Sequence, residues 1–381
     1  MSEQMLPYGR QSIDESDIEA VVGALGSDWL TTGPEVDKFE AAIALRAGAP
    51  HAISVTSGTA ALHVAYAAAG IGAGDEVVTT PLTFVATAAA AALLGAKVVF
   101  ADVDPATGIL DPQAAEAAVT ERTAAITAVD YAGVPADDAA FRDVTTRRGL
   151  LYIEDAAHSI GSLLHGRPVG SLADLTTYSF FPTKNLTTAE GGAVVTSDES
   201  LATRARAFKN HGLVRDRSAQ RYPDEGPWHQ EVHSFGLNYR LPDVLAALGR
   251  NQLERLDDFV ARRSEVKDLY DAAFIGIDGV DVPVLPAGAA PAWHLYPLRV
   301  PAERRRQVFE SLREQGIGVQ VNYIPAYWHP VFEDLGYTRG QCPNAEDYYR
   351  REISLPMFPG LTDGDVERVI AATRTALTTA R

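Results

Sequence analysis

Five short apolar runs, AISV (52–55), EVVTT (76–80), KVVF (97–100), AAITAV (124–129) and LLYIE (150–154), alternate with Ala-rich stretches of helical character. This alternation is typical of successive βα units. Because the runs are apolar on both faces, they predict an α/β fold with a mainly parallel sheet that helices cover on each side. Ligands bind beyond the carboxyl ends of the strands in such folds, so functional residues are expected just after the strands.

Two further apolar runs, 174–180 and 192–196, are joined by a loop without a helix. At least one of them is therefore expected to join the sheet antiparallel. At the other end of the chain, Ser12 and Glu15 have the spacing of a capping box, which predicts a first helix. The large domain is expected to continue to residue 250.

The second half of the chain has a different pattern. Residues 211–235 are rich in charge, Pro and Gly and predict a long loop, and residues 241–274 predict one long amphipathic helix. The remaining elements are expected as a strand at 295–300, a helix at 303–315, a short strand at 319–322 and a terminal helix at 363–377. The sequence thus predicts two domains, 1–250 with the N-terminal helices and the large sheet, and 251–381 with the linking helix and a smaller α+β unit.

The composition excludes several classes of protein. The 381 residues carry a formal net charge of -17, which argues against binding to nucleic acid or to an anionic membrane. The one cysteine, Cys342, cannot form an internal disulfide, and no Cys/His cluster has metal-ligand spacing. The N-terminus lacks the basic start and apolar run of a secretory signal, and no apolar stretch is long enough to span a bilayer. A soluble cytoplasmic enzyme is the expectation.

Lys184 stands out among the five lysines, because it alone directly follows a predicted strand, in SFFPTKNLTTAEGG (179–192). The other lysines lie on amphipathic helices (Lys38, Lys267), at a helix end (Lys209) or at the opposite edge of the sheet (Lys97). A protected amine at the carboxyl edge of a sheet is suited to bind an aldehyde covalently. The alternative interpretation is a lysine in a polar turn.

Polar groups near Lys184 suggest what that aldehyde belongs to. Asp155 ends the run LLYIED and could pair with a protonated pyridine nitrogen, although it could equally cap a helix. Ser57, Gly58 and Thr59 stand between a strand and a helix, where backbone N–H groups bind phosphate or simply cap the helix. Ser179 adds a hydroxyl on the strand that leads to Lys184.

Phe84 and His158 complete this set. Phe84 follows the run EVVTT and could stack on a flat ring, or could be part of the core. His158 could bind a ring hydroxyl, or be a polar cap. Together with Lys184, Asp155 and the phosphate cradle, these residues predict a site for pyridoxal 5'-phosphate (PLP).

The motifs TSGTAAL, EDAAHSIG, SFFPTKNLTTAEGG, KNHG and LNYRLPDVLAALG occur in this order. In this respect the chain resembles the nucleotide-sugar aminotransferases of the DegT/DnrJ/EryC1/StrS family from about Tyr8 to the C-terminus. The resemblance implies the aspartate aminotransferase type I fold. It also implies a homodimer with shared active sites, and transfer of an amino group from L-glutamate to a keto sugar.

The resemblance also implies roles for single residues. Lys184 is the attachment point of PLP, Asp155 the partner of its ring nitrogen, His158 the neighbour of its ring hydroxyl, Phe84 the stacking aromatic, and Gly58, Thr59 and Ser179 the phosphate contacts. Asn238 is expected to reach the phosphate of the neighbouring subunit's cofactor. Arg240 is expected to contact a carboxylate and Tyr323, in VNYIPAYWHP (321–330), the substrate.

Two stretches, LPYGRQSIDESDIEAVV (6–22) and SDWLTTGP (27–34), resemble the branch that aminates C4 of UDP-linked 4-keto-6-deoxy-N-acetylhexosamines on the route to pseudaminic acid. A 3-keto sugar or a keto-cyclitol is the alternative acceptor. Rival functions are a sugar dehydrase, which relatives build with histidine in place of Lys184, and a PLP-binding regulator, which would need a DNA-binding module. A nucleotide-binding α/β protein would need a motif such as G-x-G-x-x-G after an early strand.

Overall fold

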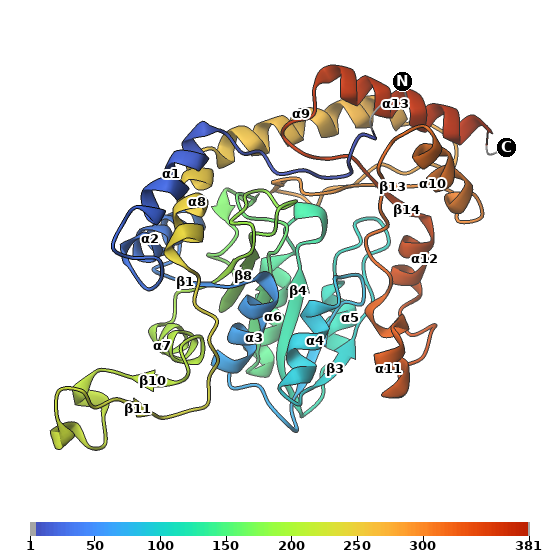
Figure 1. Ribbon diagram of the computed structural model, residues 1–381. Helices are drawn as coiled ribbons and strands as arrows, with labels where there is room; N and C mark the ends of the chain where they lie inside the picture. Colours follow the sequence, from blue (N-terminus) through green and yellow to red (C-terminus); the bar gives the residue numbers. More distant parts are fainter. Residues whose placement is uncertain (1–4, 380–381) are drawn as a thin grey trace.

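A seven-stranded sheet forms the centre of the chain, and the helices pack around it (Figure 1). The computed structural model describes residues 5–379. The first four and last two residues, which the predicted domain ranges include, lie outside the described residues. The strands of this sheet are β1 (His51–Val55), β2 (Glu76–Thr79), β3 (Lys97–Phe100), β4 (Thr123–Val129), β5 (Leu151–Asp155), β8 (Leu175–Ser179) and β9 (Gly192–Thr196), in the order β1-β9-β8-β5-β4-β2-β3.

The strand directions confirm the predicted mainly parallel sheet with one antiparallel member. β3, β2, β4, β5 and β8 pair in parallel, whereas β9 is antiparallel to both β1 and β8. The chain can reverse from β8 into β9 because a loop suffices for an antiparallel pair. Gly192 allows β9 to start beside the turn that follows β1, since a Cβ atom there would lie 2.5 Å from the carbonyl oxygen of Ser57.

The large sheet is accompanied by α1 (Glu15–Leu25), α2 (Pro34–Ala47), α3 (Gly58–Ala68), α4 (Ala86–Leu93), α5 (Pro112–Ala117), α6 (Asp138–Arg148), α7 (Glu199–Phe208) and the 3-10 turn η1 (Tyr131–Gly133). The predicted first helix is present, but its capping box is formed by Asp14 and Asp17 rather than by Ser12 and Glu15. Asp14 Oδ1 accepts the N–H of Asp17 at 3.2 Å, and Asp17 Oδ2 accepts the N–H of Asp14 at 3.1 Å. Carboxylates cap as well as hydroxyls, so spacing alone selected the wrong pair.

Residues 211–235 form a small hairpin rather than the predicted loop, and Figure 1 shows it projecting from the body below α7. It contains β10 (Leu213–Val214), β11 (Glu231–Val232) and the 3-10 turns η2 (Arg217–Ala219) and η3 (Pro223–Glu225). Glu231 holds it together by accepting the N–H groups of Arg221 and Tyr222, each at 2.7 Å. Such contacts between a side chain and backbone N–H groups leave no periodic pattern in the sequence.

The predicted long helix at 241–274 is two helices, α8 (Asp243–Glu254) and α9 (Leu256–Phe274), which meet at Arg255. The C-terminal elements are β13 (Tyr296–Arg299), α10 (Arg305–Glu314), η4 (Ala326–Trp328), α11 (Pro330–Asp334), α12 (Pro343–Arg351), β14 (Glu352–Leu355) and α13 (Asp363–Thr379). A separate three-stranded sheet consists of β6 (Leu163–Leu164), β7 (Arg167–Pro168) and β12 (Ala289–Ala290). The predicted strand at 319–322 is wrong. Gln320 makes only an isolated bridge to Ser354, and the strand that pairs with β13 is β14.

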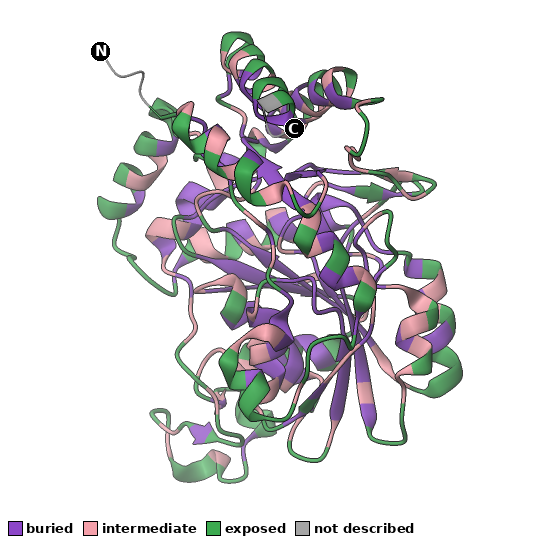
Figure 2. Ribbon diagram, turned by 90° about the vertical axis from the view of Figure 1, so that its right-hand side faces the viewer, coloured by how far each residue is buried: buried purple, intermediate pink, exposed green. Residues whose placement is uncertain are grey.

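Buried residues follow the sheet and the inner faces of the helices (Figure 2). A separate buried cluster joins α9, α10, α13, β13 and β14, and it includes Leu6 from the N-terminal segment. The division into domains at residue 250 stays a prediction. Between residues 5 and 379, no helix combines the length and apolar character that crossing a bilayer requires.

Candidate active site

A pocket of about 510 Å³ lies beyond the carboxyl ends of β1, β5 and β8. It is lined by most of the residues that the sequence singled out, namely Ser57, Gly58, Thr59, Phe84, Asp155, His158, Ser179, Lys184 and Tyr323. The sheet produces this convergence, because β1, β5 and β8 point in one direction and deliver their following residues to one edge. Residues from distant parts of the chain therefore share a single cavity.

Lys184 follows β8 and presents a partly exposed side chain to the pocket. Burial of its amine lowers the pKa to about 8, while the nearby charge of Asp155 opposes that shift. At pH 7 about a tenth of the amine is therefore uncharged, far more than for a lysine with the usual pKa of 10.5. An uncharged amine is the form that attacks a carbonyl carbon.

Asp155 ends β5 and is buried. Its Oδ2 accepts a hydrogen bond from the hydroxyl of Thr87 at 2.7 Å, and its Oδ1 accepts one from the N–H of Ala157 at 3.2 Å. Burial raises its pKa, and these hydrogen bonds oppose the rise. Among the described residues no ion pair reaches this carboxylate, so it is suited to a cationic group placed in the pocket.

The turn between β1 and α3 forms the opposite end of the pocket. Ser57 is the N-cap of α3, and its Oγ accepts the N–H of Ala60 at 3.1 Å. The first N–H groups of the helix remain available for an anion, with the helix dipole behind them. Gly58 lies so close to Ser179 that a Cβ atom would be 2.7 Å from the Ser179 Cβ. The small cradle formed by these residues fits a phosphate group.

His158 lies in the turn after β5, where no helix forms, so it is not the polar cap of a helix. Its Nδ1 accepts the N–H of Ala132 at 3.2 Å, which places the hydrogen of the neutral ring on Nε2. Nε2 then donates to the hydroxyl of Tyr323 at 3.1 Å. Burial, with a smaller effect of Lys184, lowers the pKa of His158 well below its usual value. The ring is a neutral donor that faces the pocket.

Phe84 lies at the mouth of the pocket and is not a core residue, because 59% of its surface is exposed. Its ring centroid is 6.1 Å from that of Tyr323, in an edge-to-face arrangement. An exposed aromatic face at a cavity is suited to stack on a flat ring.

Asn238 and Arg240 do not line this pocket. Asn238 is exposed and makes an isolated bridge to Asn210, and the Nη1 of Arg240 donates to the side chain of Asn210 at 2.7 Å. Both residues lie on the strand-like segment that runs beside β1, where Thr56 donates its N–H to the carbonyl of Tyr239.

Several residues of the pocket escaped the sequence reasoning, among them Tyr8, Thr87, Glu190 and His294. Thr87 is a polar residue inside an Ala-rich stretch, which is a signal that could have been noticed. His294 is buried, its ring centroid is 4.3 Å from that of His158, and its Nδ1 has no hydrogen-bond partner among the described residues. No pattern in the sequence distinguishes it from a core histidine.

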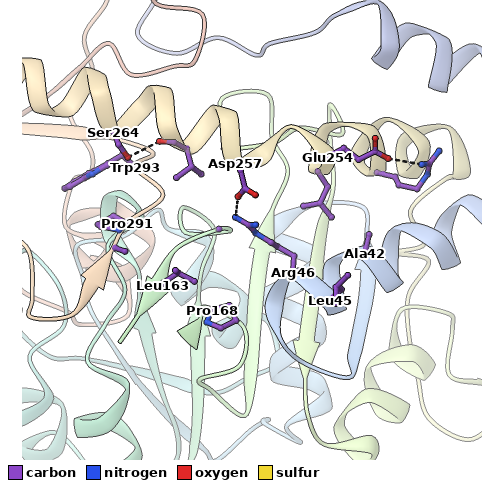
Figure 3. Close-up of a pocket in the computed structure, with 15 residues that line it drawn as sticks. Ala42, Leu45, Arg46, Leu163, Pro168, Glu254, Asp257, Ser264, Pro291 and Trp293 are labelled. Carbon is purple, nitrogen blue, oxygen red and sulfur yellow. Dashed lines mark hydrogen bonds and ion pairs between the residues drawn. The ribbon is translucent and has the colours of Figure 1, made fainter. Parts of the chain in front are cut away.

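A second cavity of about 980 Å³ lies between α2, α8, α9 and the β6–β7 hairpin (Figure 3). Its lining is largely apolar. An ion pair between Arg46 and Asp257, 2.5 Å apart, lies at this cavity and is drawn as a dashed line in Figure 3. Trp293 lines this cavity, whereas its neighbour His294 lines the smaller pocket. All of the predicted site residues except Asn238 and Arg240 line the smaller pocket, which is therefore the candidate active site.

The smaller pocket has the groups that PLP requires. A lysine whose pKa is lowered can bind its aldehyde, a buried carboxylate without an ion pair can pair with its ring nitrogen, and the helix N-terminus at Gly58 can bind its phosphate.

Comparisons with known proteins agree with this reading. The model of the DegT/DnrJ/EryC1/StrS aminotransferase family matches residues 11–374. The spore coat polysaccharide biosynthesis protein SpsC of Bacillus subtilis is 42% identical, over 97% of this chain and 96% of its own length.

Two solved structures are also similar. PseC of Helicobacter pylori, an aminotransferase involved in the biosynthesis of pseudoaminic acid, has a TM-score of 0.91 at 31% identity and covers 99% of this chain and 100% of its own. Spr1654 of Streptococcus pneumoniae in its PLP form has a TM-score of 0.92 at 28% identity, with coverage of 99% and 100%. The fold is thus that of the PLP-dependent aminotransferases of type I. The chain belongs to the DegT/DnrJ/EryC1/StrS family of sugar aminotransferases and is a PLP-dependent enzyme.

Proposed function

We propose that Lys184 binds PLP covalently and that the enzyme moves an amino group from L-glutamate to a nucleotide-linked 4-keto-6-deoxyhexose. A UDP-linked N-acetylhexosamine derivative is the favoured acceptor. The observation that carries this proposal is that the amine of Lys184, with its pKa lowered to about 8, shares one pocket with the buried Asp155 and the Ser57–Thr59 turn.

Each residue has a defined task in this proposal. PLP supplies the electron sink that lets an amino group leave one carbon skeleton and join another. The amine of Lys184 would take the proton from Cα of the amino donor and deliver it to the C4' carbon of PLP, so it would act as base and then as acid. Asp155 stabilises the positive charge on the ring nitrogen. The Nε2–H of His158 donates to the ring hydroxyl in place of Tyr323.

The similarity to PseC supports a keto-sugar acceptor of the pseudoaminic acid type. The relation to SpsC supports a role in making a polysaccharide precursor. The alternative is an aminotransferase that acts on a 3-keto sugar or a keto-cyclitol. A panel of substrates distinguishes it from an enzyme that acts on a 4-keto-6-deoxyhexose.

The charges of the pocket support a homodimer with shared active sites. Lys184 is the only lysine or arginine among the lining residues, and Asp155 and Glu190 add negative charge. A nucleotide diphosphate needs further cations or N–H donors. The exposed Asn238 and the nearby Arg240 are placed on this chain's surface, where they could serve the pocket of a second copy. We assign Asn238 to the phosphate of the cofactor in that second copy, and Arg240 to a substrate carboxylate.

The remaining rivals fit less well. A sugar dehydrase of this family uses histidine at the position of Lys184, and a regulator would have no need of a proton-transferring amine in its pocket.

The test is a half-reaction with purified holoenzyme. Adding L-glutamate is expected to shift the visible absorbance of bound PLP to that of its amine form, and a panel of nucleotide-linked keto sugars and keto-cyclitols then identifies the acceptor. Lys184→Ala is expected to abolish both the half-reaction and the visible band. Turnover by this variant at the wild-type rate would refute the proposal.

A further inference from the structure

Arg263 is a buried cation that lies next to the active site but does not line its pocket. It belongs to α9, exposes 0% of its surface and is the largest of the fully buried side chains. Figure 3 shows its helix, and labels its neighbour Ser264 beside the larger cavity. Nothing in the proposed reaction uses Arg263 directly, so its position needs another explanation.

The guanidinium donates hydrogen bonds to backbone carbonyls from three segments of the chain. Nη2 donates to the carbonyls of Thr183 and Lys184, each at 3.4 Å, and Nη1 donates to those of Trp293 and His294, each at 3.3 Å, and of Met357 at 2.9 Å. One side chain therefore ties the peptide that carries Lys184 to the segment that carries His294, and these two residues line the same pocket.

The stability of the fold alone does not explain a buried arginine at this position. Burial lowers the pKa of Arg263 to about 10, so the group keeps its charge at neutral pH, and no carboxylate pairs with it among the described residues. A buried charge without a counter-ion is costly, and apolar side chains of similar volume commonly serve a core better. A guanidinium does offer a planar set of donors that can reach several carbonyls at fixed angles, which an ammonium cannot.

Asn185 restrains the other side of Lys184. Its Nδ2 donates to the carbonyl of Ala292 at 2.7 Å and to that of His158 at 3.3 Å. The residue after Lys184 is thus tied to the turn that carries His158 and to the segment just before His294. The backbone of Lys184 is held on both sides by amide or guanidinium donors.

We propose that Arg263 and Asn185 are positioning residues that fix the main chain of Lys184, and hence the path of its amine, relative to His158 and His294. This inference rests on the proposed role of Lys184. A displacement of about 1 Å at a reacting group can lower a rate by about 100-fold, so loss of either restraint is expected to slow proton transfer more than it weakens substrate binding.

The first test is Arg263→Lys in the holoenzyme, which keeps the charge but cannot reach both segments. We expect kcat of the half-reaction, per cofactor-loaded molecule, to fall about 10- to 100-fold, with KM for L-glutamate changed less than about threefold. A second readout is capture of PLP by the apoprotein, followed by mass spectrometry of the borohydride-reduced adduct on Lys184, which is expected to slow as well.

The matched control is Arg262→Lys, on the same helix, whose guanidinium is partly exposed and binds the carbonyl of Leu361 and Asp363. It is expected to leave both readouts unchanged. Asn185→Ser is the second variant, and it decides the question if Arg263→Lys does not fold. Its control is Asn344→Ser, which also removes an amide bound to a carbonyl, that of Val103, away from the pocket lining.

The inference would be overturned if the folded Arg263 and Asn185 variants kept the kcat and the PLP capture rate of the wild type. It would also be overturned if the loss of activity equalled the fraction of variant protein that is unfolded. That result would leave the proposed function intact, provided that the wild-type enzyme completes the half-reaction. Turnover by Lys184→Ala, in contrast, would remove the proposed function itself.

Discussion

The hydroxyl of Thr87 lies 2.7 Å from Oδ2 of Asp155 and donates a hydrogen bond to it. The hydroxyl of Thr83 lies 2.7 Å from that of Thr87, so the two threonines form a chain of donors that ends on the carboxylate. This chain favours the ionised form of Asp155, which burial disfavours.

Replacement of Thr87 by Val removes the last donor and keeps the shape. Since a hydrogen bond to a charged group contributes about 1.5–3 kcal/mol, we expect the half-reaction of Thr87→Val to slow by about tenfold or more. Thr87→Ser keeps the hydroxyl and is the control. Stopped-flow absorbance with L-glutamate measures both, and equal rates in the two variants would contradict a role for the hydroxyl.

Substitution of Gly58 tests the phosphate cradle. In Gly58→Ala the new methyl group would lie 2.7 Å from the Ser179 Cβ, so the turn must move away from β8. Overpacking of this kind costs about 1–3 kcal/mol, which corresponds to a rise in the dissociation constant of PLP of about 5- to 150-fold. Gly23→Ala is the matched control, because a Cβ at Gly23 has nothing within 4 Å. Titration of the apoproteins with PLP compares them, and unchanged affinity in Gly58→Ala would speak against the cradle.

The lowered pKa of Lys184 predicts a pH dependence for cofactor capture. Below a pKa of about 8 the amine is protonated and cannot attack, so the capture rate is expected to rise with pH and to level off above about 8. An ordinary lysine would give a midpoint near its usual value of 10.5. The rate of PLP capture is measured at a series of pH values by stopping the reaction at set times, and the pH of half-maximal rate is read from the curve. A value near 10.5 would show that the pocket does not change the pKa of the amine.

Glu352 predicts a pH dependence of stability. It is buried, accepts the N–H of Asn322 at 2.7 Å, and burial raises its pKa from 4.5 to about 8. The folded protein therefore holds a proton that the unfolded chain releases. The stabilisation from this group is complete below the unfolded value of 4.5 and is lost as the pH rises through about 8.

Glu352→Gln keeps the neutral shape at every pH. Between these pH values the free energy of unfolding of the wild type is expected to fall relative to the variant, by at most about 1.4 kcal/mol per pH unit. Denaturant unfolding of both proteins at several pH values measures the difference. Parallel curves would mean that Glu352 is ionised in the folded state.

Much of the site was predictable because its residues follow strands whose apolar runs are easy to detect. Asp155 ends β5, the Ser57–Thr59 turn follows β1, and Lys184 lies in the loop after β8, and the topology of the sheet brings these strand ends together. Their positions in one pocket follow from that rule. Their individual roles in binding PLP remain predictions.

Other features depend on contacts that no local pattern records. Arg263 binds backbone carbonyls, which every residue possesses, so its partners have no signature in the sequence. The hairpin at 211–235 is held by Glu231 through N–H groups in the same way. The long helix at 241–274 breaks at Arg255 although its apolar period continues, and β14 was missed because the partner strand of β13 lies far along the chain.

The antiparallel strand β9 has a consequence for the order in which the molecule is built. Among the described strands of the central sheet, β9 is the only hydrogen-bonded neighbour of β1, and it separates β1 from β8. A nascent chain that ends before Gly192 therefore lacks the strand whose hydrogen bonds connect β1 to the rest of this sheet. We therefore expect that β9 must be synthesised before β1 can join the sheet, and with it the Ser57 turn at which we propose that the phosphate of PLP binds.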